Sequence, residues 1–179
     1  MSLQAPSQLA PSSEIPKTRS MLLRSPTIED LEEQELDVDL IPKSQIHLVL
    51  TDLAAEVFFP PIHPGIFLTS LQQLRRISTR ERNPNVALRI SVESGGCHGY
   101  QYKMGLSSVR APEDYHFTHP DTRPSNVYID AVSLPMLNGS TVDYATELIG
   151  SSFRVTGNPQ AKGGCGCGIS WELKDQTSF

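Results

Sequence analysis

The residues with the clearest chemical potential are three cysteines, each surrounded by glycine. Cys165 and Cys167 are one residue apart in the run Gly-Gly-Cys-Gly-Cys-Gly at 163–168, and Cys97 lies upstream in Ser-Gly-Gly-Cys-His-Gly-Tyr at 94–100. Thiolates are soft, negatively charged ligands that suit iron–sulfur clusters, zinc or copper(I). Side chains at i and i+2 of an extended chain point to the same side, about 6.6 Å apart. The pattern therefore predicts a metal–sulfur centre.

The glycines around the cysteines fit the same chemistry. Glycine can adopt positive φ angles and bring the backbone close to a cluster without a Cβ clash. Successive backbone N–H groups in such turns can face bridging sulfides, as they do in anion-binding nests. A buried cysteine acting as a small hydrophobe is an alternative for Cys97. It does not explain Cys165 and Cys167, because their glycine-rich segment offers almost nothing to pack.

Three other interpretations of the cysteines remain open from the residues alone. A disulfide between Cys165 and Cys167 would close a small, strained ring. A structural zinc site needs four ligands, so His98 would have to complete the set, although neighbouring residues such as Cys97 and His98 point their side chains apart. A thiol oxidoreductase would use Cys165 and Cys167 as a redox pair, but no CxxC at a helix N-terminus is present in the sequence to lower a thiol pKa.

Composition narrows the class of protein. The 179 residues are 38% hydrophobic and 20% charged, which suits one globular domain with a tail. The sequence contains no apolar run near the ~20 residues that a membrane span requires, and no basic stripe that would follow phosphates. We therefore expect no membrane and no nucleic acid among its partners. An odd number of clustered cysteines favours a reducing compartment over a secreted disulfide framework.

The first 43 residues differ from the rest of the chain. They are rich in Pro, Ser and Gln and carry eight acidic and four basic residues, which predicts a disordered tail. Up to residue 28 there is one acidic residue against three basic ones, and seven acidic residues follow between 29 and 39. This pattern is compatible with a mitochondrial transit segment. Residues 44–179 are predicted to form the folded domain.

Hydrophobic periodicity in residues 44–179 predicts a mostly β (α+β) domain with one or two helices at its N-terminal side. The strands over 86–93 and 100–106 alternate apolar and polar residues, so Cys97 is predicted in the loop between two adjacent, antiparallel strands. Residues 112–125 are polar and are predicted to form a surface excursion. The other predicted elements are helices from 53 and over 70–77, short strands at 127–129, 141–144 and 153–155, and a helical turn at 134–137.

Residues 57–69 interrupt the predicted N-terminal helix. This segment is apolar and contains several prolines, which cannot continue a helix. Without it, residue 56 would join residue 70 almost directly and restore one amphipathic helix. We predict an insertion here, arising either from the gene itself or from an intron translated in error.

The cysteine motifs resemble those of the A-type iron–sulfur carrier proteins, the HesB/IscA-like family. The similar segments are 88–102, 139–144 and 153–168, and the resemblance extends over roughly 44–174. The segment Glu-Ser-Gly-Gly-Cys-His-Gly at 93–99 is most similar to that of the second mitochondrial A-type protein of fungi. Family members end in Cys-Gly-Cys-Gly-Ser-x-Phe, whereas this chain continues Ile169-Ser170-Trp171 after Gly168. The serine has shifted, but an aromatic residue remains three positions after the glycine.

The resemblance implies a fold, a site and a role. The fold would be a compact HesB-like β-sandwich of short, largely antiparallel strands with a flexible Cys-Gly-Cys tail. Cys97, Cys165 and Cys167 would bind iron or a 2Fe–2S or 4Fe–4S cluster between the subunits of a homodimer, or of a heterodimer with another A-type carrier. The protein would not be an enzyme. It would receive the cluster from a donor and transfer it to client apoproteins in the mitochondrial matrix, during maturation of 4Fe–4S proteins.

The chemistry of the ligands supports transfer rather than a permanent redox centre. Three thiolates are an incomplete set for a cluster, which commonly has four protein ligands, so a second chain would supply the rest. Ligands on glycine-rich backbone lose conformational entropy when they bind, which lowers affinity and eases release. Donation of mononuclear iron through the same cysteines remains the alternative role.

Overall fold

The computed structural model describes residues 17–51, 78, 80, 82–97, 99–121, 123–147, 150–164 and 168–174. The predicted helices from 53 and over 70–77 lie outside these residues, as do the insertion 57–69 and the first 16 residues. Among the described residues, no helix has the length and apolar character needed to cross a membrane.

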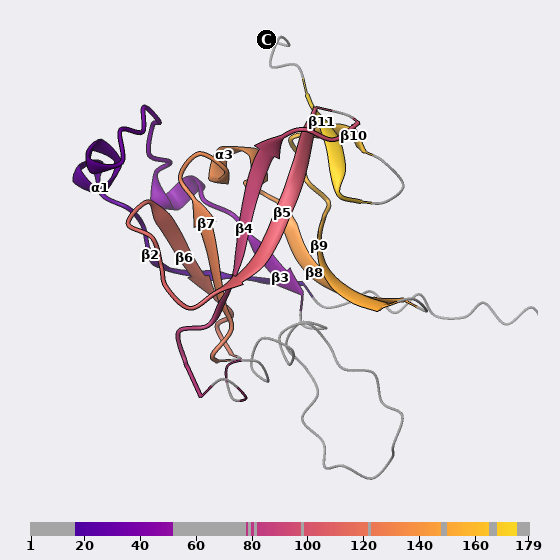
Figure 1. The fold of residues 1–179 in the computed structure, drawn as a ribbon, viewed down its shortest axis with the longest axis horizontal. Helices are drawn as coiled ribbons and strands as arrows, with labels where there is room; N and C mark the ends of the chain where they lie inside the picture. Colours follow the sequence, from indigo (N-terminus) through magenta and orange to yellow (C-terminus); the bar gives the residue numbers. More distant parts are fainter. Residues whose placement is uncertain are drawn as a thin grey trace, which may run out of the picture.

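Two β-sheets make up the body of the protein (Figure 1). One has the strand order β1–β3–β8–β9 and the other the order β10–β11–β5–β4–β7–β6–β2. The first sheet contains β1 (Lys17–Arg19), β3 (Val49–Thr51), β8 (Thr141–Glu147) and β9 (Gly150–Thr156). The second contains β2 (Met21–Arg24), β4 (Ala87–Ser94), β5 (Tyr100–Ser107), β6 (Asp114–Thr118), β7 (Asn126–Asp130), β10 (Ala161–Gly164) and β11 (Ser170–Leu173).

The pairings are largely antiparallel, as predicted. Only β3–β8 and β4–β7 run parallel among the strand pairs of the described chain. Helical structure is limited there to α1 (Ile28–Glu33), the 3₁₀ turn Lys43–Gln45 and α3 (Leu134–Leu137). The prediction of a mostly β protein is confirmed, and so are the strands and the helical turn that the alternating residues indicated between 86 and 155.

One hydrophobic core joins the two sheets. Leu50 and Val142 enter it from the four-stranded sheet, and Ile90 and Ile129 enter it from the seven-stranded sheet. Alternation along β4 buries Leu88, Ile90 and Val92 while the residues between them face outward. The arrangement is the predicted β-sandwich, in which the inner faces of two sheets share a core.

Residues 17–43 are ordered, so the prediction of a disordered tail up to residue 43 is wrong for this part. β1 pairs with β3 in one sheet, and β2 pairs with β6 in the other. A single residue, Ser20, separates β1 from β2. This segment therefore ties the two sheets together. Its acidic, proline-containing composition suggested disorder, but its spaced apolar residues reach the core: Leu22, Leu31, Leu36, Val38, Leu40 and Ile41.

Helix α1 has a local reason to begin where it does. Thr27 caps it: the Thr27 hydroxyl accepts a hydrogen bond from the Asp30 amide at 3.1 Å, and the Asp30 carboxylate accepts one from the Thr27 amide at 2.8 Å. This reciprocal capping box satisfies two backbone donors that a short helix would otherwise leave open.

The predicted surface excursion at 112–125 is also wrong. It contains β6, which lies between β7 and β2 and buries Tyr115 and Phe117. Polar residues obscured the strand in the sequence because they too are buried and hydrogen-bonded. The Ser125 hydroxyl lies 3.2 Å from the Thr118 hydroxyl and accepts a hydrogen bond from the His119 amide at 3.0 Å.

The C-terminal part is an extension of the sheet. β10 and β11 form an antiparallel pair, and β11 joins the edge of β5 through the partners Ser170–Gln101 and Trp171–Tyr100. The tail predicted to be flexible is thus bounded on both sides by strands. Cys165 and Cys167 lie outside the described residues, and their flexibility stays a prediction.

Candidate metal-binding site at the β4–β5 loop

Cys97 lies in the loop between β4 and β5, as the sequence predicted, and its side chain is exposed. The two strands pair up to Ser94 and Tyr100, and the Gly95 amide then donates a hydrogen bond to the Gly99 carbonyl at 2.8 Å. Gly96 and Gly99 have φ angles of 73° and 96°, which residues with a Cβ rarely adopt. The tight turn therefore depends on glycine and presents the thiol at the surface.

The loop contacts the C-terminal hairpin through one residue that the sequence prediction missed. Cys97 Sγ donates a hydrogen bond to Ser170 Oγ at 3.7 Å, and Ser170 Oγ donates to the Tyr100 carbonyl at 3.2 Å. Ser170 is buried although it lies beside an exposed cysteine. The only signal in the sequence was the serine's shift by one position from the family pattern.

The opposite face of β11 is anchored by aromatic packing. The Trp171 ring is stacked against Tyr100 and Tyr102, with centroid distances of 5.3 and 5.5 Å. Asn158 donates to the Tyr102 hydroxyl at 2.8 Å, and burial raises the pKa of the Tyr102 phenol. The aromatic residue three positions after Gly168 is thus packed against the sheet.

The structure places the other two cysteines by chain connection alone. Cys165 follows Gly164 at the end of β10, and Cys167 precedes Gly168, two residues before β11. Both cysteines and His98 lie outside the described residues, so the meeting of three thiols stays a prediction. Within the parts of the chain that the structure describes, no group of three His, Cys, Asp or Glu side chains can hold a metal ion.

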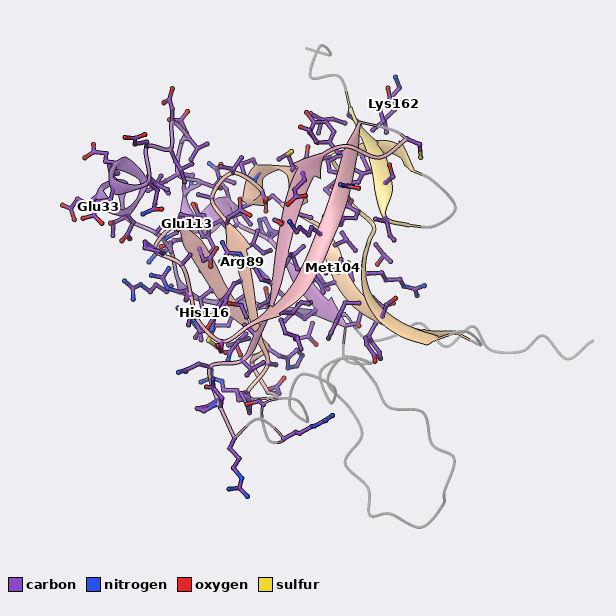
Figure 2. All side chains as sticks on the ribbon, in the orientation of Figure 1. Glu33, Arg89, Met104, Glu113, His116 and Lys162 are labelled. Atoms are coloured by element: carbon purple, nitrogen blue, oxygen red, sulfur yellow. The ribbon has the colours of Figure 1, made fainter. Side chains whose placement is uncertain are left out.

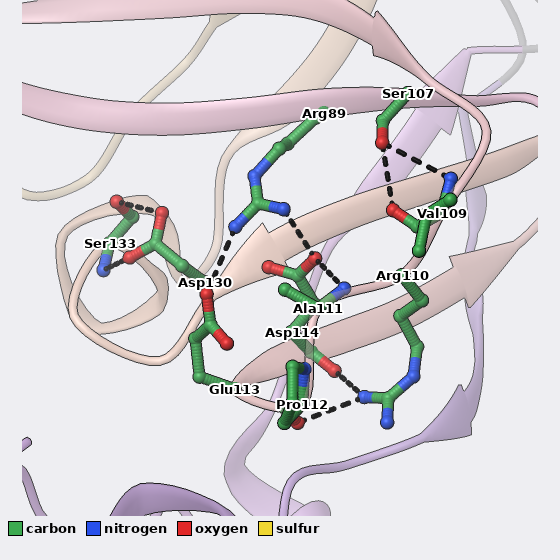
Figure 3. A network of polar contacts seen from close by, with 10 residues as sticks. All are labelled: Arg89, Ser107, Val109, Arg110, Ala111, Pro112, Glu113, Asp114, Asp130 and Ser133. Carbon is green, nitrogen blue, oxygen red and sulfur yellow. Dashed lines mark hydrogen bonds and ion pairs between the residues drawn. The ribbon is translucent and has the colours of Figure 1, made fainter. Parts of the chain in front are cut away.

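A second polar cluster lies elsewhere on the seven-stranded sheet, and it is structural (Figure 3). Arg89 on β4 contacts Asp114 at 2.8 Å and Glu113 at 3.3 Å. Asp114 is fully buried and also accepts a hydrogen bond from the Ala111 amide at 2.9 Å. Burial raises the pKa of the Asp114 carboxyl, although that amide and the Arg89 guanidinium oppose the shift. Because the cluster contains the Arg89 guanidinium, it is suited to holding the strand and the loop together rather than to binding a cation.

The Arg89 cluster and the Cys97 loop are well separated on the seven-stranded sheet. Figure 2 shows Arg89, Glu113 and His116 together over β4, β6 and β7, whereas Lys162 lies at the other end beside β10 and β11. Cys97 lies at the β10–β11 end, because its loop contacts Ser170 of β11. Its exposed sulfur, on a turn that contains Gly96 and Gly99, has the donor chemistry that a soft metal centre requires.

Comparison with known proteins agrees with the site. Residues 69–169 match the family described as iron-sulphur cluster biosynthesis, and the chain belongs to this family. The resemblance to A-type, HesB/IscA-like proteins is thereby confirmed.

Individual relatives cover part of the chain. It is 40% identical over 103 residues to iron-sulfur assembly protein 2 of Schizosaccharomyces pombe, covering 58% of this chain and 49% of that protein. It is 47% identical over 87 residues to the human mitochondrial iron-sulfur cluster assembly 2 homolog, covering 49% and 54%. The chain thus spans about half the length of these curated relatives. A crystal structure of IscA with a [2Fe-2S] cluster aligns with a TM-score of 0.49 at 30% identity, over 59% of this chain and 94% of that one.

Proposed function

We propose that this protein binds an iron–sulfur cluster as cargo through Cys97, Cys165 and Cys167 and transfers it to apoproteins. The observation that carries the proposal is the position of Cys97. It is exposed on a glycine turn and in contact with Ser170, three residues after Cys167. A cargo needs ligands that an acceptor's thiols can reach, and an exposed sulfur at a sheet end meets that need.

The chain's own residues divide the work in this proposal. Trp171 and Tyr100 hold β11 on the sheet, so the hairpin that contains Cys165 and Cys167 starts and ends at fixed strands. The glycine turn leaves Cys97 at the surface. Ligands on glycine-rich backbone lose conformational entropy when they bind, and this entropic cost keeps the cluster exchangeable.

Three thiols leave a 2Fe–2S or 4Fe–4S cluster one ligand short, so a second chain supplies the remainder. The partner is a second copy or another A-type carrier, and donor and client apoproteins meet the same surface. Membership of a family with mitochondrial relatives supports a place in the mitochondrial matrix, in maturation of 4Fe–4S proteins. In this role the cysteines exchange their iron–sulfur bonds for those of an acceptor's thiols, and the cluster passes on unchanged, so the proposed role is that of a carrier rather than an enzyme.

Anaerobic purification tests the proposal. Iron and acid-labile sulfide should be present in comparable amounts, with Mössbauer spectra of a cluster, and both should be lost in a Cys97→Ser variant. The matched control is Ser94→Ala, which changes an exposed residue of the same hairpin and should keep both. Retention of full iron and sulfide by a Cys165→Ser, Cys167→Ser double variant would contradict the ligand set.

The same measurement separates the alternatives. Iron without sulfide would indicate a mononuclear iron donor. A colourless protein that cycles between thiol and disulfide would indicate an oxidoreductase.

A further inference from the structure

We propose that Ser170 is a positioning residue, which fixes the Cys97 loop to the strand that follows Cys165 and Cys167. This inference rests on the proposed function, because its importance comes from bringing two ligand-bearing segments together. It concerns a residue that is not itself expected to bind the cluster.

The first argument is the reach of one hydroxyl. Ser170 Oγ accepts a hydrogen bond from Cys97 Sγ at 3.7 Å and donates one to the Tyr100 carbonyl at 3.2 Å. A serine hydroxyl supplies one donor and two acceptor positions, so it can make both contacts at once. It therefore links β11, the first residue of β5 and the loop between β4 and β5.

The second argument is the space at Gly96. A Cβ at Gly96 would lie 2.4 Å from Ser170 Oγ, well inside contact distance. The loop can approach the serine this closely only because residue 96 has no side chain. The positive φ of Gly96 and the position of Ser170 thus belong to one arrangement.

The third argument is that neighbouring residues of β11 make different contacts. Adjacent residues of a strand face opposite sides of the sheet. Trp171 packs into the core on one side, and Ser170 faces the Cys97 loop on the other. Ile169, which precedes Ser170, is exposed, and its carbonyl accepts a hydrogen bond from the Tyr102 amide at 3.0 Å. Ser170 is therefore the residue of β11 that connects to Cys97.

Cross-linking tests the position of Ser170 without any metal. In a chain with Cys165→Ser and Cys167→Ser, a Ser170→Cys change should form an intramolecular disulfide with Cys97 on mild oxidation. Oxidation would then consume both thiols, and the product would remain a monomer. Such a bond requires the two Cβ atoms to come within about 4.5 Å. Ile169→Cys in the same background is the control and should remain reduced. Equal oxidation of both variants, or none in Ser170→Cys, would overturn the placement.

Cluster retention tests the role. In the chain with all three cysteines, Ser170→Ala should release iron to a chelator roughly 10-fold faster, as is typical when a ligand's supporting contact is lost. The visible circular dichroism of the bound cluster should change as well, while the apoprotein keeps a cooperative unfolding transition whose midpoint is lowered only slightly by the lost hydrogen bond. Unchanged release and an unchanged spectrum would overturn the inference and leave the proposed function standing. If the parent binds neither iron nor sulfide, the proposed function fails instead, and the cross-link still decides where Ser170 lies.

Discussion

The two ends of the seven-stranded sheet are built on different principles. At the β2–β6–β7 end, the buried carboxylate of Asp114, its partly exposed partner Arg89 and the paired N-terminal strand β2 close the sheet. At the β5–β11–β10 end, glycine turns and an exposed thiol replace them, and the buried Trp171 anchors the end with Tyr100 and Tyr102 packed beside it.

The difference shows how one sheet can serve two purposes. A buried carboxylate paired with Arg89 and a ladder of paired strands restrict the first end to one arrangement. The second end rests on a short strand, whose register with β5 has two partner pairs. A site that must bind and release its cargo belongs at this second end, where little packing has to change.

The largest expected effect comes from removing the anchor of the β11 end. Trp171→Ala should lower the free energy of unfolding by about 4 kcal/mol, because it deletes a large, fully buried side chain. Urea denaturation measures this loss. Trp171→Phe should lose less than half as much, since the indole Nε1 has no hydrogen-bond partner in the part of the chain that the structure describes. Equal losses in both variants would show that the indole makes a polar contact.

The next effect tests whether the N-terminal segment belongs to the β2–β6–β7 end, here called the closed end in contrast to the open β5–β11–β10 end. Leu31→Ala in α1 should lower the free energy of unfolding by about 3 kcal/mol, because Leu31 is part of the core. Ile28→Ala in the same helix is the control: Ile28 is 66% exposed, and its loss should be within about 0.5 kcal/mol. If Leu31→Ala were as mild as its control, residues 17–43 would be a tail after all.

A pH series examines the buried carboxyl of the closed end. Burial raises the pKa of Asp114 in the folded state above its ordinary value of 3.8, against the pull of Arg89 and with that of Glu113 and Asp130. The folded state then binds more protons than the unfolded state between these two pKa values. The stability from this group is complete below pH 3.8 and is lost as pH rises through the folded pKa.

Asp114→Asn, which stays neutral, should therefore gain stability relative to the parent as pH rises from about 4 towards neutrality. Urea midpoints at several pH values measure the difference. A difference that moves the other way would mean that the ion pair with Arg89 outweighs the cost of burial.

The smallest effect is expected for the exposed ion pair near the open end. Lys103 Nζ and Glu93 Oε1 are 2.7 Å apart, but both side chains are well exposed. Glu93→Gln should change the free energy of unfolding by less than about 1 kcal/mol, and salt should reduce the difference further. A loss approaching that of Leu31→Ala would remove the contrast between the two ends.

Sequence reasoning succeeded where the pattern was local. The alternation in β4 and β5, and the glycines between them, placed Cys97 in its loop without reference to any other part of the chain. It failed for β6 and for residues 17–43, where the partners are distant. β2 and β6 are nearly a hundred residues apart, and polar residues such as Asp114 become strand residues only when another strand and a loop satisfy them.

The sequence by itself determined the soft-ligand chemistry, the family and the need for glycine beside Cys97. These follow from residue types and from backbone conformations that only glycine adopts readily. The tertiary structure alone decided that Ser170 touches Cys97, that the N-terminal segment ties the two sheets, and that the Asp114 carboxylate is buried at one end of the sheet. Each of these depends on register between strands far apart in the chain, and register is set by the packing of the whole core.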